Sequence, residues 1–200
     1  GRGRPVNADS TIRLRRPRSR PANWYSERVS GIGVTAASRV VGAAPMTTAT
    51  MSGAFALLSE FLREDGHYLA SSGAYGDGGG GALASALDLF LARPELGFVW
   101  LASAEVDATP ATVGACVVCY AISTSRGTLV AKLDDVTIGR GWQGRGVGSA
   151  MLAALGEALR ARGITRIDTA CPRANAGAWR FYARLGFRPL DEERFALLLV

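Results

Sequence analysis

The stretch that most constrains the fold is Gln143–Gly163, QGRGVGSAMLAALGEALRARG, in which a glycine-rich turn runs directly into an amphipathic helix. Leu152, Leu155 and Leu159 share one face of that helix, and Gly163 is a typical stop signal. A strand-like segment precedes the turn. A turn in this position leaves backbone N–H groups at the positive end of the helix dipole, which suits a phosphate group. The stretch therefore predicts an anion-binding loop, and the alternative is a glycine-rich turn without a ligand.

The spacing of the glycines separates this loop from two common phosphate-binding loops. The P-loop requires Gly-Lys followed by Ser or Thr, and no lysine occurs in this stretch. The dinucleotide-binding fingerprint requires G-x-G-x-x-G, whereas Gly144, Gly146 and Gly148 are spaced G-x-G-x-G. What remains is Q-x-x-G-x-G between a strand and a helix, a backbone arrangement suited to a pyrophosphate.

The strand before the loop, LVAKLDDVTI over residues 129–138, changes the phase of its apolar residues. Leu129, Ala131 and Leu133 share one phase of the alternation, whereas Val136 and Ile138 take the other. A strand with one buried face changes phase only if it contains an extra residue, so we expect a β-bulge near the two aspartates at 134 and 135. Burial on both faces is the plain alternative, which the two aspartates disfavour.

The remaining patterns complete a single layered α/β domain with a mixed sheet. Asn175 is a candidate N-cap for the last helix, and Cys116 and Cys119 read as small residues of a buried strand. The expected order is helix, helix, three strands, helix, strand, helix, strand. The helices fall at 53–63, 82–92, 147–162 and 176–185, and the strands at 97–103, 112–122, 129–138, 164–171 and 193–200.

Residues 1–45 differ in composition from the rest of the chain. They hold nine arginines against Asp9 and Glu27, whereas the remainder carries 14 basic and 15 acidic side chains. They also lack helical or strand periodicity, so we expect a disordered basic extension or leader, with the domain proper spanning 46–200. A transit peptide, a nucleic-acid-binding arm and a segment upstream of a natural start at Met46 are the alternatives.

Composition narrows the class of protein further. No apolar run approaches the length that crosses a bilayer, so we expect no membrane partner. Three cysteines and one histidine without a repeated ligand spacing argue against a metal site or a disulfide framework. We expect a cytoplasmic location, or an organellar one if residues 1–45 belong to a transit peptide.

The segment from Leu133 to Phe187 resembles the GNAT (Gcn5-related N-acetyltransferase) superfamily. DDVTIGRGWQGRGVGSAML resembles the signature strand, bulge and pyrophosphate loop of that family, and NAGAWRFYARLGF resembles its second signature. The resemblance is strong over residues 97–200, weaker over 53–93, and does not reach 1–45. It implies a mostly antiparallel mixed sheet with a β-bulge and splayed central strands, flanked by helices. It also implies acetyl-CoA as co-substrate.

The resemblance assigns roles to residues at three places. The first is the cofactor site, where backbone groups of the bulged strand pair with pantetheine, the loop holds pyrophosphate, and the start of the last helix touches the cofactor. Its residues are Val136, Thr137, Ile138, Gln143, Gly144, Arg145, Gly146, Val147, Gly148, Ser149 and Asn175. The second is the acceptor pocket, which the resemblance places at Glu64, Asp65 and His67.

The third place is the catalytic centre, where the acceptor amine attacks the acetyl carbonyl directly. Tyr182 matches the family tyrosine that protonates the thiolate leaving group, and its alternative role is that of a core aromatic. An alkylamine must first lose a proton, and Asp134 and Asp135 are the nearest candidate bases. Two surface carboxylates that stabilise a bulge are an equal alternative.

The resemblance therefore predicts an N-acetyltransferase that modifies a primary amine of a small molecule or a protein. An acyl-CoA-binding regulator without turnover and an aminoglycoside-modifying acetyltransferase are the alternatives. A homodimer stays open, and nucleic acid is not an expected partner.

Overall fold

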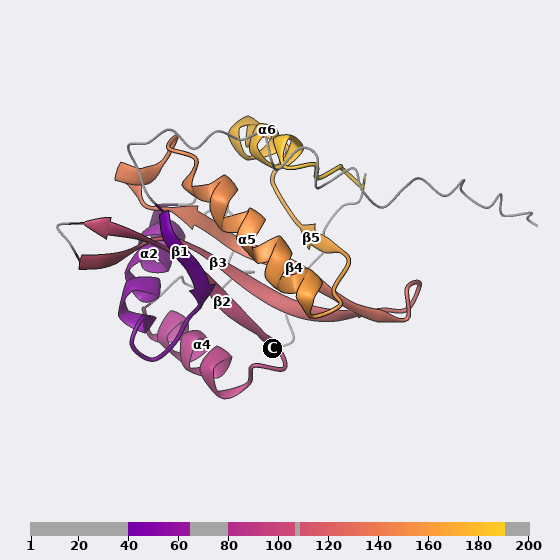
Figure 1. The fold of residues 1–200 in the computed structure, drawn as a ribbon, viewed down its shortest axis with the longest axis horizontal. Coiled ribbons are helices and arrows are strands. Elements are labelled where there is room, and N and C mark those ends of the chain that lie inside the picture. The colour runs from indigo at the N-terminus through magenta and orange to yellow at the C-terminus, as the bar shows by residue number, and fades with distance from the viewer. Residues whose placement is uncertain (1–39, 65–79, 107–108, 191–200) are drawn as a thin grey trace, which may run out of the picture. The chain divides into compact units, whose positions relative to one another are not determined.

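The computed structural model describes residues 40–64, 80–106 and 109–190 (Figure 1). The elements are β1 (Val40–Pro45), α2 (Met51–Glu64), α4 (Gly80–Ala92), β2 (Gly97–Val106), β3 (Thr109–Ser123), β4 (Thr128–Ile138), the 3₁₀ turn η1 (Arg140–Trp142), α5 (Val147–Ala161), β5 (Ile167–Thr169) and α6 (Ala176–Arg184). Asp65, His67 and the strand expected at 193–200 lie outside the described residues. No helix within the described part is long and apolar enough to cross a bilayer.

The five strands form one mixed sheet in the order β1-β2-β3-β4-β5. The first four are antiparallel neighbours along the chain, and β5 joins β4 in parallel after the crossover through α5. The fold class expected from the sequence, a mostly antiparallel mixed sheet flanked by helices, is confirmed.

Both faces of the sheet are buried, because β2 places alternate side chains in two different cores. Phe98 and Trp100 pack with Met151 and Leu155 of α5, and the indole Nε1 of Trp100 donates to the carbonyl of Met151 at 3.1 Å. Val99 and Leu101 pack on the opposite face, against the buried leucines of α2 and α4. The domain therefore has three layers, with α2 and α4 on one side of the sheet and α5 on the other (Figure 1).

The β-bulge expected in β4 is confirmed. Ala115 pairs with Thr137 and Val117 pairs with Asp134, so one residue of β3 faces two of β4, Asp135 and Val136. The extra residue is Asp135, whose φ of 49° lies in the left-handed region. Because of it, Leu133, Val136 and Ile138 all pack into the core beneath α5.

The central strands separate directly before this bulge. β5 pairs with β4 only from Ala131–Ile167 to Leu133–Thr169, and no described pairing between the two strands continues past that point. The sequence predicted a longer strand over residues 164–171, but β5 has only three residues because its neighbour turns away. The splay expected from the family resemblance is confirmed.

The N-terminal boundary differs from the prediction. Residues 40–45, assigned to the extension, form β1, and Ala43 and Ala44 pair with Ala102 and Leu101 of β2. The segment VVGAAP shows no alternation of apolar and polar residues, so only its pairing with β2 reveals it as a strand. Residues 1–39 lie outside the described part, and their role as an extension stays a prediction.

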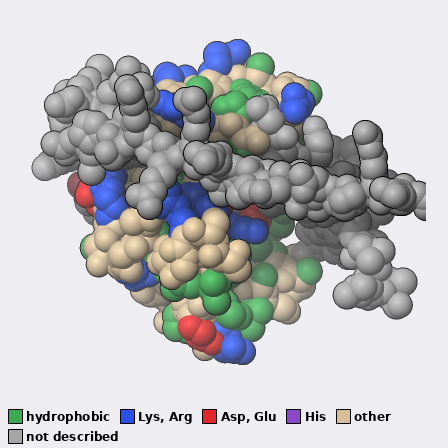
Figure 2. Space-filling model, turned by 90° about the vertical axis from the view of Figure 1, so that its right-hand side faces the viewer, with side chains coloured by type: hydrophobic (Ala, Val, Ile, Leu, Met, Phe, Trp, Pro, Cys, Tyr) green, Lys and Arg blue, Asp and Glu red, His purple; other side chains and the backbone are tan. Residues whose placement is uncertain are grey.

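Basic side chains gather at the end of the domain that carries the β3–β4 turn (Figure 2). Two of the arginines at this end bind other segments of the chain, and a third binds within its own segment. Arg162 donates to the Tyr120 hydroxyl at 2.8 Å, Arg126 donates to Thr165 Oγ1 at 3.3 Å, and Arg166 forms an ion pair with Asp168 at 3.1 Å. These contacts connect the β3–β4 hairpin, the end of α5 and β5.

Candidate active site

The turn before α5 takes a conformation that requires glycine at two positions. Gly144 has φ = 71° and Gly146 has φ = 80°, both in the left-handed region, and a Cβ at either position would meet no other atom. Gly146 is also the N-cap of α5, and no side chain caps this helix end. The backbone N–H groups of the first turn of α5 are therefore available to a ligand, as an anion site requires.

The third glycine has a different structural reason. Gly148 has no positive φ, but a Cβ there would lie 3.3 Å from the ring of Phe181 and 3.5 Å from Ile138. Gly148 thus allows α6 to approach α5 closely, a role that the glycine pattern alone did not reveal. Its backbone N–H, with those of Val147 and Ser149, still belongs to the first turn of the helix.

One side-chain and one backbone hydrogen bond hold the start of the loop. Nε2 of Gln143 donates to the carbonyl of Ile138 at 3.0 Å, and the Trp142 N–H donates to the carbonyl of Gly139 at 2.8 Å. The guanidinium of Arg145 lies over the Trp142 ring, 5.7 Å from its centroid. A cation–π contact with Trp142 therefore keeps the charge of Arg145 at the loop.

Tyr182 lies where the central strands separate. Its ring packs edge-on against Phe181 and Phe187, with centroid distances of 5.3 Å in each pair. Its hydroxyl reaches the Thr169 side chain, which also donates to the carbonyl of Leu133 at 3.2 Å. Because Leu133–Thr169 is the last pair of the β4–β5 ladder, the phenol lies at the point of divergence.

The environment of Tyr182 keeps the phenol protonated. Burial raises its pKa above the usual value, and the hydrogen bond with Thr169 offsets only part of that rise. Negative charge on Asp134 acts in the same direction as burial. The group can therefore hold a proton at neutral and mildly alkaline pH, as a general acid must.

The two aspartates occupy different positions in the bulge. Asp134 is half-buried and pairs across the sheet with Val117, and its charge acts on Tyr182. Asp135 is the bulged residue. Burial raises the pKa of the Cys119 thiol, and both carboxylates add to that rise. Which of the two aspartates serves as a base stays a prediction.

Asn175 caps α6 as the sequence predicted. Its Oδ1 accepts a hydrogen bond from the Ala178 N–H at 3.0 Å. The cap accounts for the position of the side chain, and a contact between Asn175 and the cofactor stays a prediction.

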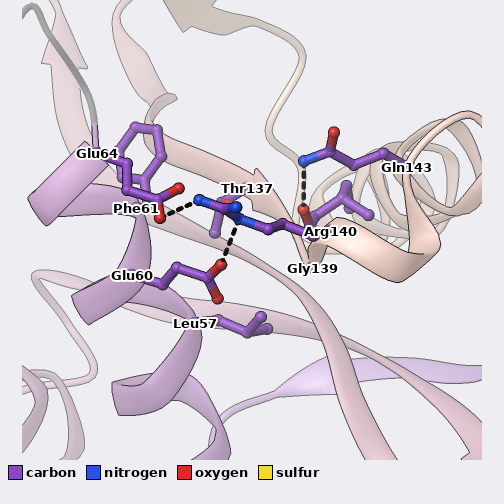
Figure 3. A pocket seen from close by; sticks show the side chains of 9 residues that line it. Leu57, Glu60, Phe61, Glu64, Thr137, Gly139, Arg140 and Gln143 are labelled. Atoms are coloured by element: carbon purple, nitrogen blue, oxygen red, sulfur yellow. Dashed lines mark hydrogen bonds and ion pairs between the residues drawn. The ribbon is translucent and has the colours of Figure 1, made fainter.

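A pocket of about 220 Å³ lies between α2 and the end of β4 (Figure 3). It brings together Glu64 from the expected acceptor site with Thr137, Ile138 and Gln143 from the expected cofactor site. Five lining residues were missed by the sequence analysis: Leu57, Glu60, Phe61, Gly139 and Arg140. The spacing of Glu60 and Glu64, one helical turn apart, was a signal that could have indicated a shared face.

Arg140 crosses this pocket to α2. It forms an ion pair with Glu60 at 2.9 Å and a second with Glu64 (Figure 3). The hydrogen bond to Glu64 and the two negative charges raise the pKa of Arg140, which therefore stays cationic. No local pattern could have predicted a contact between residues so far apart in the sequence.

Several solved structures share this fold, and two of the three described here are named as acetyltransferases. An aminoglycoside N-acetyltransferase, AAC(6')-Iy, in complex with CoA has a TM-score of 0.64 at 14% identity, covering 82% of this chain and 98% of its own. A ribosomal-protein-alanine N-acetyltransferase from Brucella melitensis biovar Abortus 2308 has a TM-score of 0.58 at 13% identity, covering 80% and 99%. An integron cassette protein from the mobile metagenome of Cole Harbour Salt Marsh has a TM-score of 0.61 at 23% identity, covering 79% and 90%.

The sequence itself also matches a family model. No curated protein matches the chain significantly. The model for the acetyltransferase (GNAT) family matches residues 61–187, which is more than half of the chain and includes the glycine loop, the bulge and Tyr182. The chain therefore belongs to the acetyltransferase (GNAT) family.

Proposed function

We propose that this protein is an acetyl-CoA-dependent N-acetyltransferase that transfers the acetyl group directly to a primary amine within a ternary complex. The observation that carries the proposal is the position of Tyr182. A phenol with a raised pKa lies where β4 and β5 part, and the charge of Asp134 acts on it. A proton donor and a carboxylate at the opening of the sheet are what an acyl transfer to an amine needs.

The chain offers a fitting site for the cofactor. The first turn of α5 follows two left-handed glycines and supplies uncapped N–H groups for the pyrophosphate, with Arg145 held nearby. Val136, Thr137 and Ile138 follow the point where β5 leaves β4, so their backbone groups can pair with the pantetheine arm. Support for this assignment comes from the CoA complex of the aminoglycoside N-acetyltransferase of the same fold.

The reaction needs three proton transfers. The acceptor, an ammonium ion at neutral pH, gives a proton to Asp134, directly or through water, and the neutral amine then attacks the acetyl carbonyl carbon. The nitrogen carries one extra proton after the attack and releases it to water as the amide forms. The new C–N bond forms and the C–S bond breaks, so that the electron pair leaves on the CoA sulfur. Tyr182 donates its proton to that thiolate, and the raised pKa of the phenol keeps the proton available over the neutral range.

The acceptor is a primary amine. Two of the structures with this fold are named for aminoglycoside and ribosomal-protein-alanine substrates, so both small molecules and protein termini are reasonable candidates for this chain. The pocket beside α2 also carries the carboxylates of Glu60 and Glu64, both of which form ion pairs with Arg140. An acyl-CoA-binding regulator without turnover is the second candidate, because a binding loop alone does not imply catalysis.

A thiol-release assay separates the two candidates. Acetyl-CoA is incubated with a panel of aminoglycosides, polyamines, amino acids and peptides with free N-termini, and CoA thiol and acetylated product are both measured. We expect release that depends on an amine and product in matching amount. CoA binding by calorimetry without release on any amine would identify a regulator, and no CoA binding would overturn the proposal altogether.

A further inference from the structure

The ion pairs of Arg140 are exposed and contribute little to the stability of the fold. The Arg140 side chain is 70% exposed, and those of Glu60 and Glu64 are 41% and 49% exposed. Solvent-exposed ion pairs generally stabilise a protein only slightly. The stability of the fold therefore does not explain why Arg140 is paired with Glu60 and Glu64.

The location of the cluster formed by Glu60, Glu64 and Arg140 suggests a role in ligand binding. Glu60, Glu64 and Arg140 line the same pocket as Gln143, which is the first residue of the loop proposed to hold the pyrophosphate. Two carboxylates beside an anion site repel the ligand, because like charges raise its energy in that place. Arg140 reduces the net charge of this cluster from two negative units to one.

The backbone around Arg140 directs its side chain to α2. Residues 139–143 form a tight turn, closed by the Trp142 N–H on the carbonyl of Gly139 and by Gln143 on the carbonyl of Ile138. From this turn the guanidinium extends across the pocket to the two carboxylates (Figure 3). Its charge is thus placed between α2 and the loop.

We propose that Arg140 is a positioning residue that acts on cofactor affinity through Glu60 and Glu64, by keeping their negative charge from opposing the cofactor pyrophosphate, without touching the cofactor itself. The inference rests on the proposed function, since it requires an anionic cofactor at the loop. It also assigns the two α2 carboxylates to charge balance rather than to acceptor binding.

The test is a charge-rescue series. Arg140→Met, Glu60→Gln/Glu64→Gln and the triple variant are compared by calorimetry with CoA. At an ionic strength of about 10 mM, where the Debye length is about 30 Å, Arg140→Met should raise the Kd roughly three- to tenfold. At about 1 M, where that length is about 3 Å, the difference should vanish. The triple variant should bind within about twofold of the parent at low salt.

The matched control is Arg93→Met. Arg93 also forms an exposed ion pair, with Glu95 just beyond α4, and it does not line the pocket. The control changes the net charge by the same amount and should leave the Kd unchanged. Arg140→Lys should retain most of the affinity, which keeps the test open if Arg140→Met folds poorly.

Each other outcome decides against the inference. An unchanged Kd in Arg140→Met overturns it while leaving the proposed function intact. A triple variant as weak as Arg140→Met would mean that Arg140 contacts the cofactor or holds the loop mechanically. A raised KM for the amine in Glu60→Gln/Glu64→Gln, with unchanged CoA affinity, would assign the carboxylates to the acceptor. A parent chain that binds no CoA overturns both proposals.

Discussion

At the scale of single residues, the packing around Tyr182 raises the pKa of its phenol. Tyr182 has its ring enclosed by two phenylalanines and its hydroxyl against Thr169, so burial of the ring raises the pKa of the phenol. A raised pKa means that the acid form persists until the pH passes above the usual value near 10. Tyr182 can therefore act as an acid throughout the range in which an enzyme of this kind is normally assayed.

Replacing Tyr182 by Phe tests this role. The ring and its packing stay, so the melting temperature and CoA affinity should change little, whereas turnover should fall roughly 10²- to 10⁴-fold. In the parent chain the alkaline loss of activity should lie above about pH 10, and the variant should lack it. Steady-state rates across pH provide the measurement. A Phe variant that acetylates its best amine at the parental rate would remove Tyr182 from the mechanism.

Substitutions at Asp134 and Asp135 distinguish the role of each aspartate. Asp134 is half-buried, follows the last pair of the β4–β5 ladder and is the base of the proposed mechanism, so Asp134→Asn should lower turnover by roughly 10²- to 10⁴-fold. Asp135→Asn should retain both turnover and stability, because Asn tolerates the left-handed backbone at φ = 49°. Asp135→Val should lose about 1–2 kcal/mol of the free energy of unfolding in a denaturation experiment. A large loss of turnover in Asp135→Asn would exchange the two roles.

At the scale of elements, α5 has a left-handed glycine at each end, and the two ends serve different purposes. Gly146 opens the helix with φ = 80° at the expected cofactor site, whereas Gly163 follows its last turn with φ = 76° at the opposite end. A Cβ would meet nothing at either position. The two positions therefore form a matched pair for substitution.

Gly146→Asp should abolish measurable CoA affinity or weaken it by at least about 100-fold, because it strains the turn and places a carboxylate against the pyrophosphate. Gly163→Asp carries a similar backbone strain and should lower the melting temperature by a comparable amount. It should leave CoA affinity unchanged, as measured by calorimetry. Equal affinities in the two variants would show that the loop does not bind the cofactor.

Elements with strong local patterns were predictable from the sequence, and those defined by distant contacts were not. The leucine stripe of α5 and the cap at Asn175 are local, and the phase change of the apolar residues was enough to locate the bulge in β4. β1 has no alternation, and its strand character comes from pairing with β2. The bridge from Arg140 to α2 and the packing role of Gly148 depend on segments that the sequence alone does not bring together.

At the scale of the whole domain, the sheet separates two functional sides. Val136 and Ile138 pack with α5 and α6, and Thr137 faces the pocket beside α2. Ile138 and Gln143 also line that pocket, so the two sides of the sheet meet at the end of β4, where the loop before α5 begins.

The edge strand β1 makes the N-terminal boundary testable. A chain that begins at Val40 keeps every β1–β2 pair and should melt with the full-length protein. A chain that begins at Met46 loses those hydrogen bonds and should melt about 5–15 °C lower, which corresponds to several kcal/mol in a domain of this size. Calorimetric melting curves of the three chains provide the comparison. An equal melting temperature for the chain from Met46 would mean that β1 is dispensable.

The bulge in β4 has a further consequence for how this chain tolerates the loss of a codon. Deleting Asp135 would place Cys116 opposite Val136 and leave Leu133, Val136 and Ile138 on the face they already occupy. It would also remove the left-handed φ from the strand. We therefore expect the deletion to melt at or above the temperature of the parent while losing acetyl transfer, since β4 could then continue beside β5. Such a result would show that folding does not need the bulge at Asp135 and that acetyl transfer does.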